Sequence, residues 1–219
     1  MTAAARHTSL PPEGAPGSGP RRPEAWGGAM PSLNTLAVAA DAGVLHVTLN
    51  RPAARNAMSL QMVDELRAVL ARAEAGGDVR VVVLRGAGGH FCAGADLQDM
   101  AQARQRELDG EADAIAAVNA RFGVLCGAFA RTGLATVAVL EGSVMGGGLG
   151  LACVVDVALA GQGVQVRLPE TSLGVVPAQV AAFLVERVGA SQARRLAVTG
   201  GRLDGAQALG RGVVHEVHA

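Results

Sequence analysis

Apolar and polar residues alternate along residues 36–50, LAVAADAGVLHVTLN, on both sides of a central turn. A period of two places every second side chain on the same face of a strand, so one face of each arm can pack on a core. The segment therefore predicts a β-hairpin that ends at Asn50-Arg51-Pro52.

The pattern then changes to a helical period. Ser59 is a residue type that favours the N-cap, and Gly76-Gly77 is a stop signal, so a helix is predicted between them. Its apolar face consists of Val63, Leu66, Leu70 and Ala73. Residues 79–86, VRVVVLRG, follow as a β-branched run typical of a strand buried on both faces. Strand, helix and strand at this length predict a βαβ crossover.

Helices and strands keep alternating through the rest of the chain. Residues 97–131 are rich in alanine and broadly helical, with a predicted break at Asp109-Gly110. Further strands are expected in ATVAVLEG, VVDVALA, VQVRL and GVVHEV, a short helix after the glycine loop, and helices in PAQVAAFLVERVG and SQARRLAVTG. This order predicts an α/β fold with a mostly parallel sheet and helices on its faces.

Residues 1–30 differ from the rest, because they hold most of the prolines and show no apolar periodicity. Such a segment cannot bury enough surface to fold, so we expect a disordered N-terminal extension and one folded domain over residues 31–219. Its arginines and few acids are compatible with a transit peptide, but it lacks the apolar core of a secretory signal. Met30 precedes the first regular segment, and we expect the natural start there.

Composition narrows the classes of function. The 219 residues carry 19 basic and 19 acidic side chains, and every basic residue is arginine. Balanced, scattered charge argues against nucleic-acid binding, and the lack of lysine excludes a lysine-based mechanism. The longest charge-free apolar stretch, near residues 142–155, is too short to span a bilayer. We therefore expect no nucleic-acid or membrane partner, but a small molecule or further copies of the chain.

The three cysteines, Cys92, Cys126 and Cys153, have no CxxC spacing and an odd count. This pattern favours neither a disulfide framework nor a structural metal site, so no metal ion is expected. It fits a reducing, cytoplasmic location. A cysteine nucleophile at Cys92 is disfavoured, because only His90 is near it as a base and a cysteine beside phenylalanine usually packs in a core.

Two glycine-containing loops each follow a buried strand and enter a helix: FCAGAD at residues 91–96 and MGGGLG at residues 145–150. Small residues let the backbone approach a ligand, and the free N–H groups of a first helical turn point outward as donors. Two such loops side by side would form an oxyanion hole, although glycines also simply allow tight turns. Neither nucleotide motif fits, because a P-loop requires lysine and the GxGxxG pattern that begins at Gly146 has Leu151 at its third glycine.

Four motifs occur in the order and at the spacing of the crotonase superfamily, the enoyl-CoA hydratase/isomerase family: LNRPAARNAMS, VVVLRGAGGHFCAGADL, GSVMGGGLGLACVVDVALA and RLPETSLGVVPA. The sequence resembles this family over about residues 36–217. The resemblance implies a ββα spiral core, usually assembled as a homotrimer or as a hexamer of two trimers. It also implies an acyl-coenzyme A thioester as substrate, with no permanently bound cofactor.

By that resemblance, the backbone N–H groups of Ala95 and Gly147 hold the thioester carbonyl oxygen and stabilise an enolate. The ARNA loop resembles the segment that embraces coenzyme A. The implied contacts with the substrate and its coenzyme A are Arg55, Ala57, Ala93, Ala95, Asp96, Leu97, Gly147 and Gly148. Arg55 could pair with a phosphate or be a solvated surface residue, and Asp96 could be no more than an N-cap.

Hydratases of this family carry two glutamates that position and deprotonate the attacking water. The second matches Glu170 in LPET, whereas the first falls on Gly150. A single glutamate is compatible with a Δ3,Δ2-enoyl-CoA isomerase, in which one carboxylate moves a proton between carbons.

A finer resemblance favours hydration. AMSLQMVDEL, LEGSVMGGGLGLAC and LPETSLGVVPAQVA are most similar to hydratases of branched glutaconyl-CoA esters, the isohexenylglutaconyl-CoA and methylglutaconyl-CoA hydratases. Their substrates carry a second carboxylate, and glycine in place of glutamate removes a like charge. The favoured prediction is therefore a hydratase of a branched 2-enoyl-CoA, with Glu170 as acid and base.

A third alternative is a non-catalytic homologue. Family members usually continue beyond GVVHEV with helices that cover the acyl site and pack between subunits. The sequence ends shortly after that segment, so the C-terminal helical region is expected to be truncated.

Overall fold

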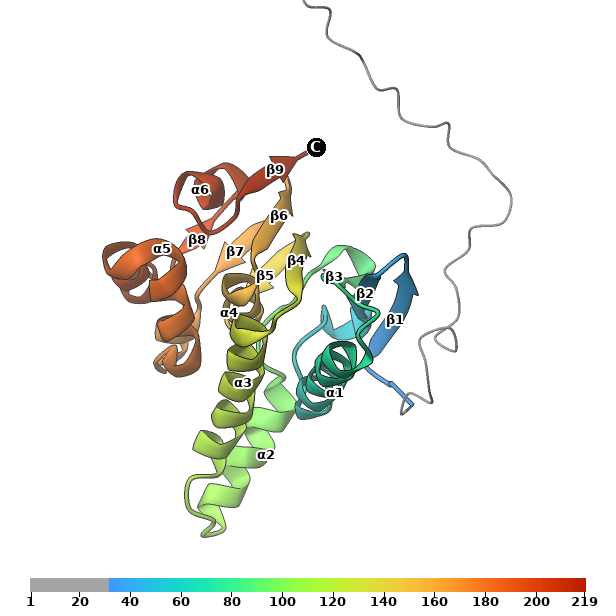
Figure 1. The fold of residues 1–219 in the computed structure, drawn as a ribbon. Coiled ribbons are helices and arrows are strands. Elements are labelled where there is room, and N and C mark those ends of the chain that lie inside the picture. The colour runs from blue at the N-terminus through green and yellow to red at the C-terminus, as the bar shows by residue number, and fades with distance from the viewer. Residues whose placement is uncertain (1–31) are drawn as a thin grey trace, which may run out of the picture.

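The computed structural model describes residues 32–219 (Figure 1). The extension predicted over residues 1–30 lies outside the described residues. The strands and longer helices follow one another as β1 Leu36–Asp41, β2 Val44–Leu49, α1 Leu60–Gly76, β3 Val81–Gly86, α2 Leu97–Leu108, α3 Ala114–Arg131, β4 Ala135–Leu140, β5 Ser143–Met145, α4 Gly147–Val154, β6 Val157–Gly161, β7 Gln165–Arg167, α5 Ala178–Thr199, β8 Arg202–Leu203, α6 Gly205–Gly210 and β9 Glu216–His218.

Residues 32–219 form two sheets, of which the larger has six strands in the order β1-β2-β3-β4-β6-β9. β1 and β2 are the predicted hairpin and pair antiparallel, while each later pair of neighbours is parallel. β2, α1 and β3 form the predicted βαβ crossover, in which Val44 pairs with Val81 and Leu49 with Gly86. The expectation of an α/β fold with a mostly parallel sheet is confirmed.

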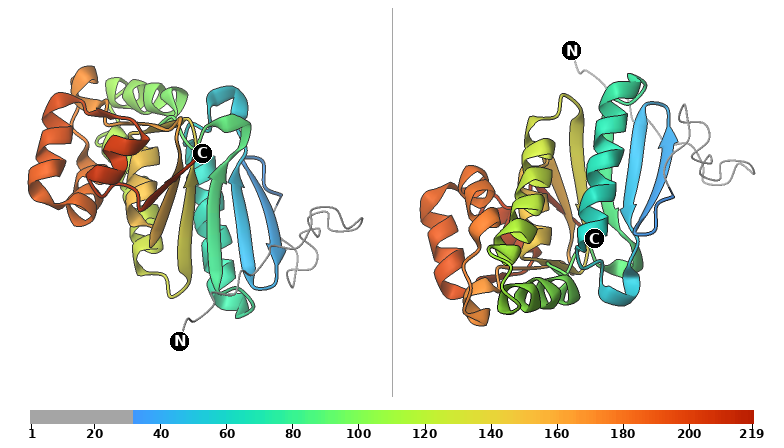
Figure 2. Two further views of the ribbon diagram at one scale, coloured as in Figure 1. Left: turned by 90° about the horizontal axis from the view of Figure 1, so that it is seen from above. Right: turned by 90° about the horizontal axis from the view of Figure 1, so that it is seen from below.

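Helices α1 and α3 lie along one face of this sheet (Figure 2). α1 begins as predicted, because the Ser59 side chain accepts a hydrogen bond from the Met62 N–H at 3.2 Å. It ends before Gly77, whose φ of 71° lies in the left-handed region that glycine tolerates. Its buried face includes the four predicted residues, Val63, Leu66, Leu70 and Ala73.

The helical region at residues 97–131 is interrupted where the sequence predicts. α2 ends at Leu108, Gly110 has a φ of 99°, and α3 starts at Ala114. α3 packs against α1, α2, α4 and α5. By length and composition alone α3 could also cross a membrane, a test that the core helix of a soluble protein passes equally.

A second sheet, in the order β5-β7-β8, carries the segment that leads into α4. The sequence predicts β7, because VQVRL alternates apolar and polar residues, but it does not predict β5 or β8, whose residues show no such alternation. The strand expected in GVVHEV is wrong in its extent. Only Glu216–His218 pairs with β6, because Val213 still closes the turn after α6 by donating its N–H to the Ala208 carbonyl.

The last helices lie at the end of the molecule opposite β1 and β2 (Figure 1). The two helices expected over residues 177–200 are confirmed. α5 spans Ala178–Thr199, but Gly189 interrupts it with a φ of 77° and a ψ of 159°, which are not helical. α6 is missed by the sequence pattern, although Asp204 and Gln207 form a capping box at its start. Arg187 joins α5 to the end of α4, because its guanidinium donates to the carbonyls of Ala152, Cys153 and Val155.

Candidate active site

The two glycine-containing loops lie side by side. Cys92 pairs in parallel with β5: its N–H donates to the Ser143 carbonyl at 2.9 Å, and its carbonyl accepts from the Met145 N–H at 3.0 Å. In each of the two segments, a predicted donor follows the paired residue by three positions. Ala95 follows Cys92, and Gly147 follows Val144. The register therefore places the two predicted donors at matching positions of neighbouring segments.

Both N–H groups are available to a ligand. Gly147 is the first residue of α4, and such a residue has no hydrogen-bond acceptor within its own helix. Ala95 is exposed, and its neighbours Gly94 and Asp96 make the backbone bonds with Met58. In the part of the chain that the structure describes, neither of these two N–H groups donates a hydrogen bond. Two free donors at neighbouring positions are suited to binding one oxygen.

Glycines allow the loops to approach this closely. A methyl group on Gly94, whose φ is 101°, would lie 3.2 Å from the Met145 carbonyl oxygen. A methyl group on Gly146, with a φ of 47°, would lie 3.8 Å from Cα of Gly94. On Gly148 it would lie 2.6 Å from the Cys92 carbonyl oxygen and 2.8 Å from Cys92 Cβ. The glycines thus serve close packing between the loops as well as the turns themselves.

Glu170 lies beside these loops. It opens a short 3-10 turn, Glu170–Leu173, and its Oε1 is 3.0 Å from the point that a methyl group on Gly146 would occupy. Its Oε2 is buried and has no hydrogen-bond partner among residues 32–219. Burial raises the pKa of this carboxyl above its usual value, and a hydrogen bond from its own backbone opposes the shift. A half-buried, unpaired carboxylate with a raised pKa is suited to proton exchange with a ligand.

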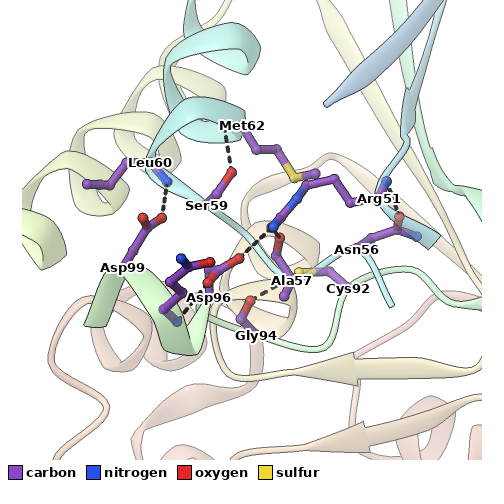
Figure 3. Close-up of polar contacts among 11 residues, drawn as sticks. Arg51, Asn56, Ala57, Ser59, Leu60, Met62, Cys92, Gly94, Asp96 and Asp99 are labelled. Carbon is purple, nitrogen blue, oxygen red and sulfur yellow. Dashed lines mark hydrogen bonds and ion pairs between the residues drawn. The ribbon is translucent and has the colours of Figure 1, made fainter. Parts of the chain in front are cut away.

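An ion pair fastens the first loop (Figure 3). Arg51 Nη1 donates to Asp96 Oδ2 at 2.7 Å and to the Ala57 carbonyl at 2.6 Å. Asp96 also accepts from the Gln98 N–H at 2.8 Å and thereby caps α2. Burial raises the pKa of Asp96, but the Arg51 guanidinium and the backbone bond together hold it below its usual value. The N-cap interpretation of Asp96 is confirmed, while its contact with coenzyme A stays a prediction.

Sequence reasoning missed Arg51 and Asn56 as residues that shape the site. Asn56 is fully buried; its Oδ1 accepts from the Arg51 N–H at 2.8 Å, and its Nδ2 donates to the carbonyls of Ala87 and His90 at 2.9 and 2.7 Å. Its φ of 56° is left-handed. The available signal was the residue type, since asparagine tolerates this backbone region better than most residues.

The predicted coenzyme A contacts cluster around the ARNA loop. The Arg55 carbonyl accepts a hydrogen bond from the Ala93 N–H at 3.0 Å, which places the ARNA loop against FCAGAD. The Arg55 guanidinium is exposed and has no partner among the described residues, so it is available to an anionic group. Leu97 is 79% exposed at the start of α2. The Ala93 N–H and the Ala57 carbonyl are already bonded to protein, and the role of each of these residues in binding stays a prediction.

Gly150, where the resemblance places a glutamate, faces an aromatic ring. A methyl group at this position would lie 3.1 Å from Phe122 Cζ and 3.2 Å from both Phe122 Cε1 and Val180 Cγ2. Carbon atoms not bonded to each other prefer separations of about 3.5–4.0 Å. Even one added carbon would therefore crowd this space, and a glutamate would need the ring to move.

The cysteines are packing residues here. All three are free and buried. Burial raises the pKa of the Cys92 thiol to about 11, and it raises the pKa of Cys126 and Cys153 as well. The thiols are thus protonated at neutral pH, which supports the expectation that Cys92 is not a nucleophile. Within residues 32–219 no group of three His, Cys, Asp or Glu side chains could hold a metal ion.

Known proteins match this fold and these motifs. A family model described as Enoyl-CoA hydratase/isomerase matches residues 39–219. The sequence is 35% identical over 179 residues to Enoyl-CoA hydratase domain-containing protein 2, mitochondrial, of Bos taurus, a match that covers 81% of this chain and 58% of that protein. It is 34% identical over 190 residues to 2,3-dehydroadipyl-CoA hydratase of Escherichia coli, with 84% and 69% covered.

Among solved structures, Pseudomonas aeruginosa AtuE is similar with a TM-score of 0.81 and 53% identity, over 85% of this chain and 70% of that one. The chain therefore belongs to the enoyl-CoA hydratase/isomerase family, and the predicted crotonase-like fold is confirmed. It spans less than two thirds of the length of the cattle relative.

Proposed function

We propose that the protein hydrates a 2-enoyl-CoA thioester, with the Ala95 and Gly147 N–H groups on the carbonyl oxygen and Glu170 as acid and base. The observation that carries this proposal is the Glu170 carboxylate, half-buried and unpaired beside two adjoining loops with free donors. Such a site offers both a place for negative charge and a group that can exchange a proton.

The chemistry follows from these positions. Two hydrogen bonds to the thioester oxygen stabilise the enolate that forms as water adds at C3, with each donor contributing about 3 kcal/mol to the transition state. The Glu170 carboxylate takes a proton from the attacking water, and the carboxylic acid then returns a proton to C2. Its raised pKa brings the acid and base forms closer in free energy, which suits a group that must act as both.

We further propose a branched, glutaconyl-type acyl group. Such a substrate carries a second carboxylate, and a site with one glutamate repels it less than a site with two. The relative from Escherichia coli is named for a dehydroadipyl ester, whose acyl group also derives from a dicarboxylic acid.

A Δ3,Δ2-enoyl-CoA isomerase is the second candidate, and the observation in its favour is the same single carboxylate. An isomerase needs one base that moves a proton between two carbons and no bound water. The purified protein should be assayed with 3-methylglutaconyl-CoA, isohexenylglutaconyl-CoA, crotonyl-CoA and a 3-enoyl-CoA.

We expect hydration of the branched esters, and a loss of about 1,000-fold in kcat in Glu170→Gln. Glu186→Gln, at an exposed glutamate of α5, is the matched control and should keep full activity. Turnover of the 3-enoyl ester alone would favour the isomerase, and full activity in Glu170→Gln would remove Glu170 from the mechanism. A folded protein that neither binds nor converts any ester would be the non-catalytic homologue.

For the assembly we propose a cytoplasmic homotrimer or a hexamer of two trimers, as the family resemblance implies. Light scattering of the purified chain measures the oligomer, and fractionation of the source cells measures the location. A monomer, or protein confined to an organelle or membrane fraction, would contradict the respective part.

A further inference from the structure

Phe122 occupies the space beside the proposed oxyanion donor. It projects from α3, is only partly buried, and packs against the core. Its Cε2 and Cζ atoms lie 3.5 Å from the point that a methyl group on Gly147 would occupy. The same ring lies 3.1 Å from the corresponding point on Gly150, one turn along α4. The ring therefore covers the first turn of the helix that carries the Gly147 N–H.

The second contact at this place is also apolar. Val180, from α5, is buried and lies 3.2 Å from the same point on Gly150. Two helices thus meet over α4 with hydrocarbon surface. An acyl group whose carbonyl oxygen is bound at Gly147 starts next to this surface, because its first carbons are within a few bond lengths of that oxygen.

We propose that Phe122 is a specificity-determining residue that receives the alkyl branch of the acyl group. An apolar group gains free energy when it contacts the ring and leaves water, whereas a carboxylate placed there would lose its hydration without gaining a partner. The alkyl branch of a 3-substituted glutaconyl ester therefore faces Phe122, and the distal carboxylate points away from it. This inference rests on the proposed function, since it takes the substrate to be an acyl-CoA held at Gly147.

The inference is tested by binding and not by turnover, so that it can fail separately from the proposed reaction. Two saturated esters that cannot be hydrated, 3-methylglutaryl-CoA and glutaryl-CoA, differ by one methyl group. Isothermal titration calorimetry of the whole chain should show about a 10-fold tighter Kd for the methyl-bearing ester, the lower end of what one such group contributes in an apolar pocket. In Phe122→Ala this preference should fall to less than about twofold.

Two further variants guard against a folding artefact. Phe129→Leu changes a buried phenylalanine on the same helix, two turns away, and should keep the 10-fold preference. Gly150→Ala pushes the ring from the other side, because the added methyl group meets Phe122 Cζ at 3.1 Å. It should weaken binding of 3-methylglutaryl-CoA about fivefold and leave glutaryl-CoA within about twofold.

The outcomes separate the two claims. A preference that survives in Phe122→Ala, or that is absent from the wild-type protein, overturns the role of Phe122 even if the branched enoyl esters are hydrated. A preference that Phe122→Ala abolishes supports that role even if no ester is hydrated, in which case only the proposed reaction fails. If neither ester binds, both claims fail together.

Discussion

The two loops that carry the candidate donors are built in opposite ways. The first, residues 91–96, is held by polar side chains: Arg51 bonds Asp96, and Asn56 binds the carbonyl of His90. The second, residues 145–150, is shaped by missing side chains, since Gly148 leaves room for the Cys92 backbone. The first loop should therefore be weakened by removing side-chain atoms, and the second loop by adding them.

The largest effect is expected from an added methyl group in the second loop. In Gly148→Ala, the new Cβ would lie 2.6 Å from a backbone oxygen that cannot rotate away, so the loops must separate. We expect a loss of about 2 kcal/mol in the free energy of unfolding. We also expect about a 100-fold loss in kcat/KM, because the Gly147 donor is displaced. Urea denaturation and the hydration assay measure the two effects.

Gly163→Ala is the control for this prediction. Gly163 has open space around its Cα and no positive φ, so its change should be nearly neutral. Equal behaviour of the two variants would show that close packing does not shape the second loop.

An intermediate effect is expected from atoms removed beside the first loop. Arg51→Met leaves the Asp96 carboxylate, whose side chain is 11% exposed, and the Ala57 carbonyl without their donor. We expect a loss of about 2 kcal/mol in the free energy of unfolding, below the range for fully buried pairs because Arg51 is partly solvated. Arg106→Met breaks an exposed pair with Glu111 of 3.0 Å and should cost at most about 0.5 kcal/mol. If Arg51→Met were no worse than Arg106→Met, the ion pair would not be what holds the first loop.

A smaller effect is expected from Asp96 on the stability of the protein at low pH. Because the pKa of Asp96 is lowered in the folded protein, its stabilising contribution is complete above the pKa of the unfolded chain, near 4. It is lost as the pH falls through the lower, folded value. Denaturation curves between about pH 6 and pH 3 should therefore show a steeper loss in the wild-type protein than in Asp96→Asn. Parallel curves would show that Asp96 gains nothing from its ionised form.

The smallest expected effect is the pH dependence of stability that Glu170 causes, and its sign is opposite to that of Asp96. Neither loop provides a hydrogen-bond partner for the Glu170 Oε2 atom. Its raised pKa means that the folded protein holds this proton more tightly than the unfolded chain does. The wild-type protein should therefore lose stability relative to Glu170→Gln as the pH rises through the folded pKa. The melting temperatures of the two proteins, compared from pH 4 to pH 8, should diverge in favour of the variant. A wild-type protein that gains on the variant with rising pH would mean that the carboxylate has a partner.

The sequence predicted those elements that show a regular apolar period or carry a local start or stop signal. The hairpin of β1 and β2, the Ser59 cap and the break before α3 are confirmed because each depends on local residue types. β5 and β8 carry no such local signal, and their strand form comes from pairing with β7. The final strand is overestimated because Val213 and Val214 are apolar for packing and not for pairing.

The site divides in the same way. The pattern of glycines predicted the two loops that lie side by side, because a close approach between backbone segments requires small residues. Arg51, Asn56 and Phe122 were not predicted as site residues, because their partners are distant in the sequence: Asp96 is 45 residues from Arg51, and Gly150 faces Phe122 from another helix. The spacing of residues in a single sequence does not reveal which distant residues make contact.

The backbone origin of the two candidate donors has a consequence for inheritance. Every residue except proline supplies an N–H, so point mutations at positions 95 and 147 can shift or crowd these donors but rarely delete them. Side chains such as Glu170 and Phe122 have no such protection and can be exchanged in one step. For the proposed reaction, a lineage with this fold can therefore change the residue that exchanges the proton, or the acyl chain that fits, and still keep the two N–H groups assigned to the thioester oxygen.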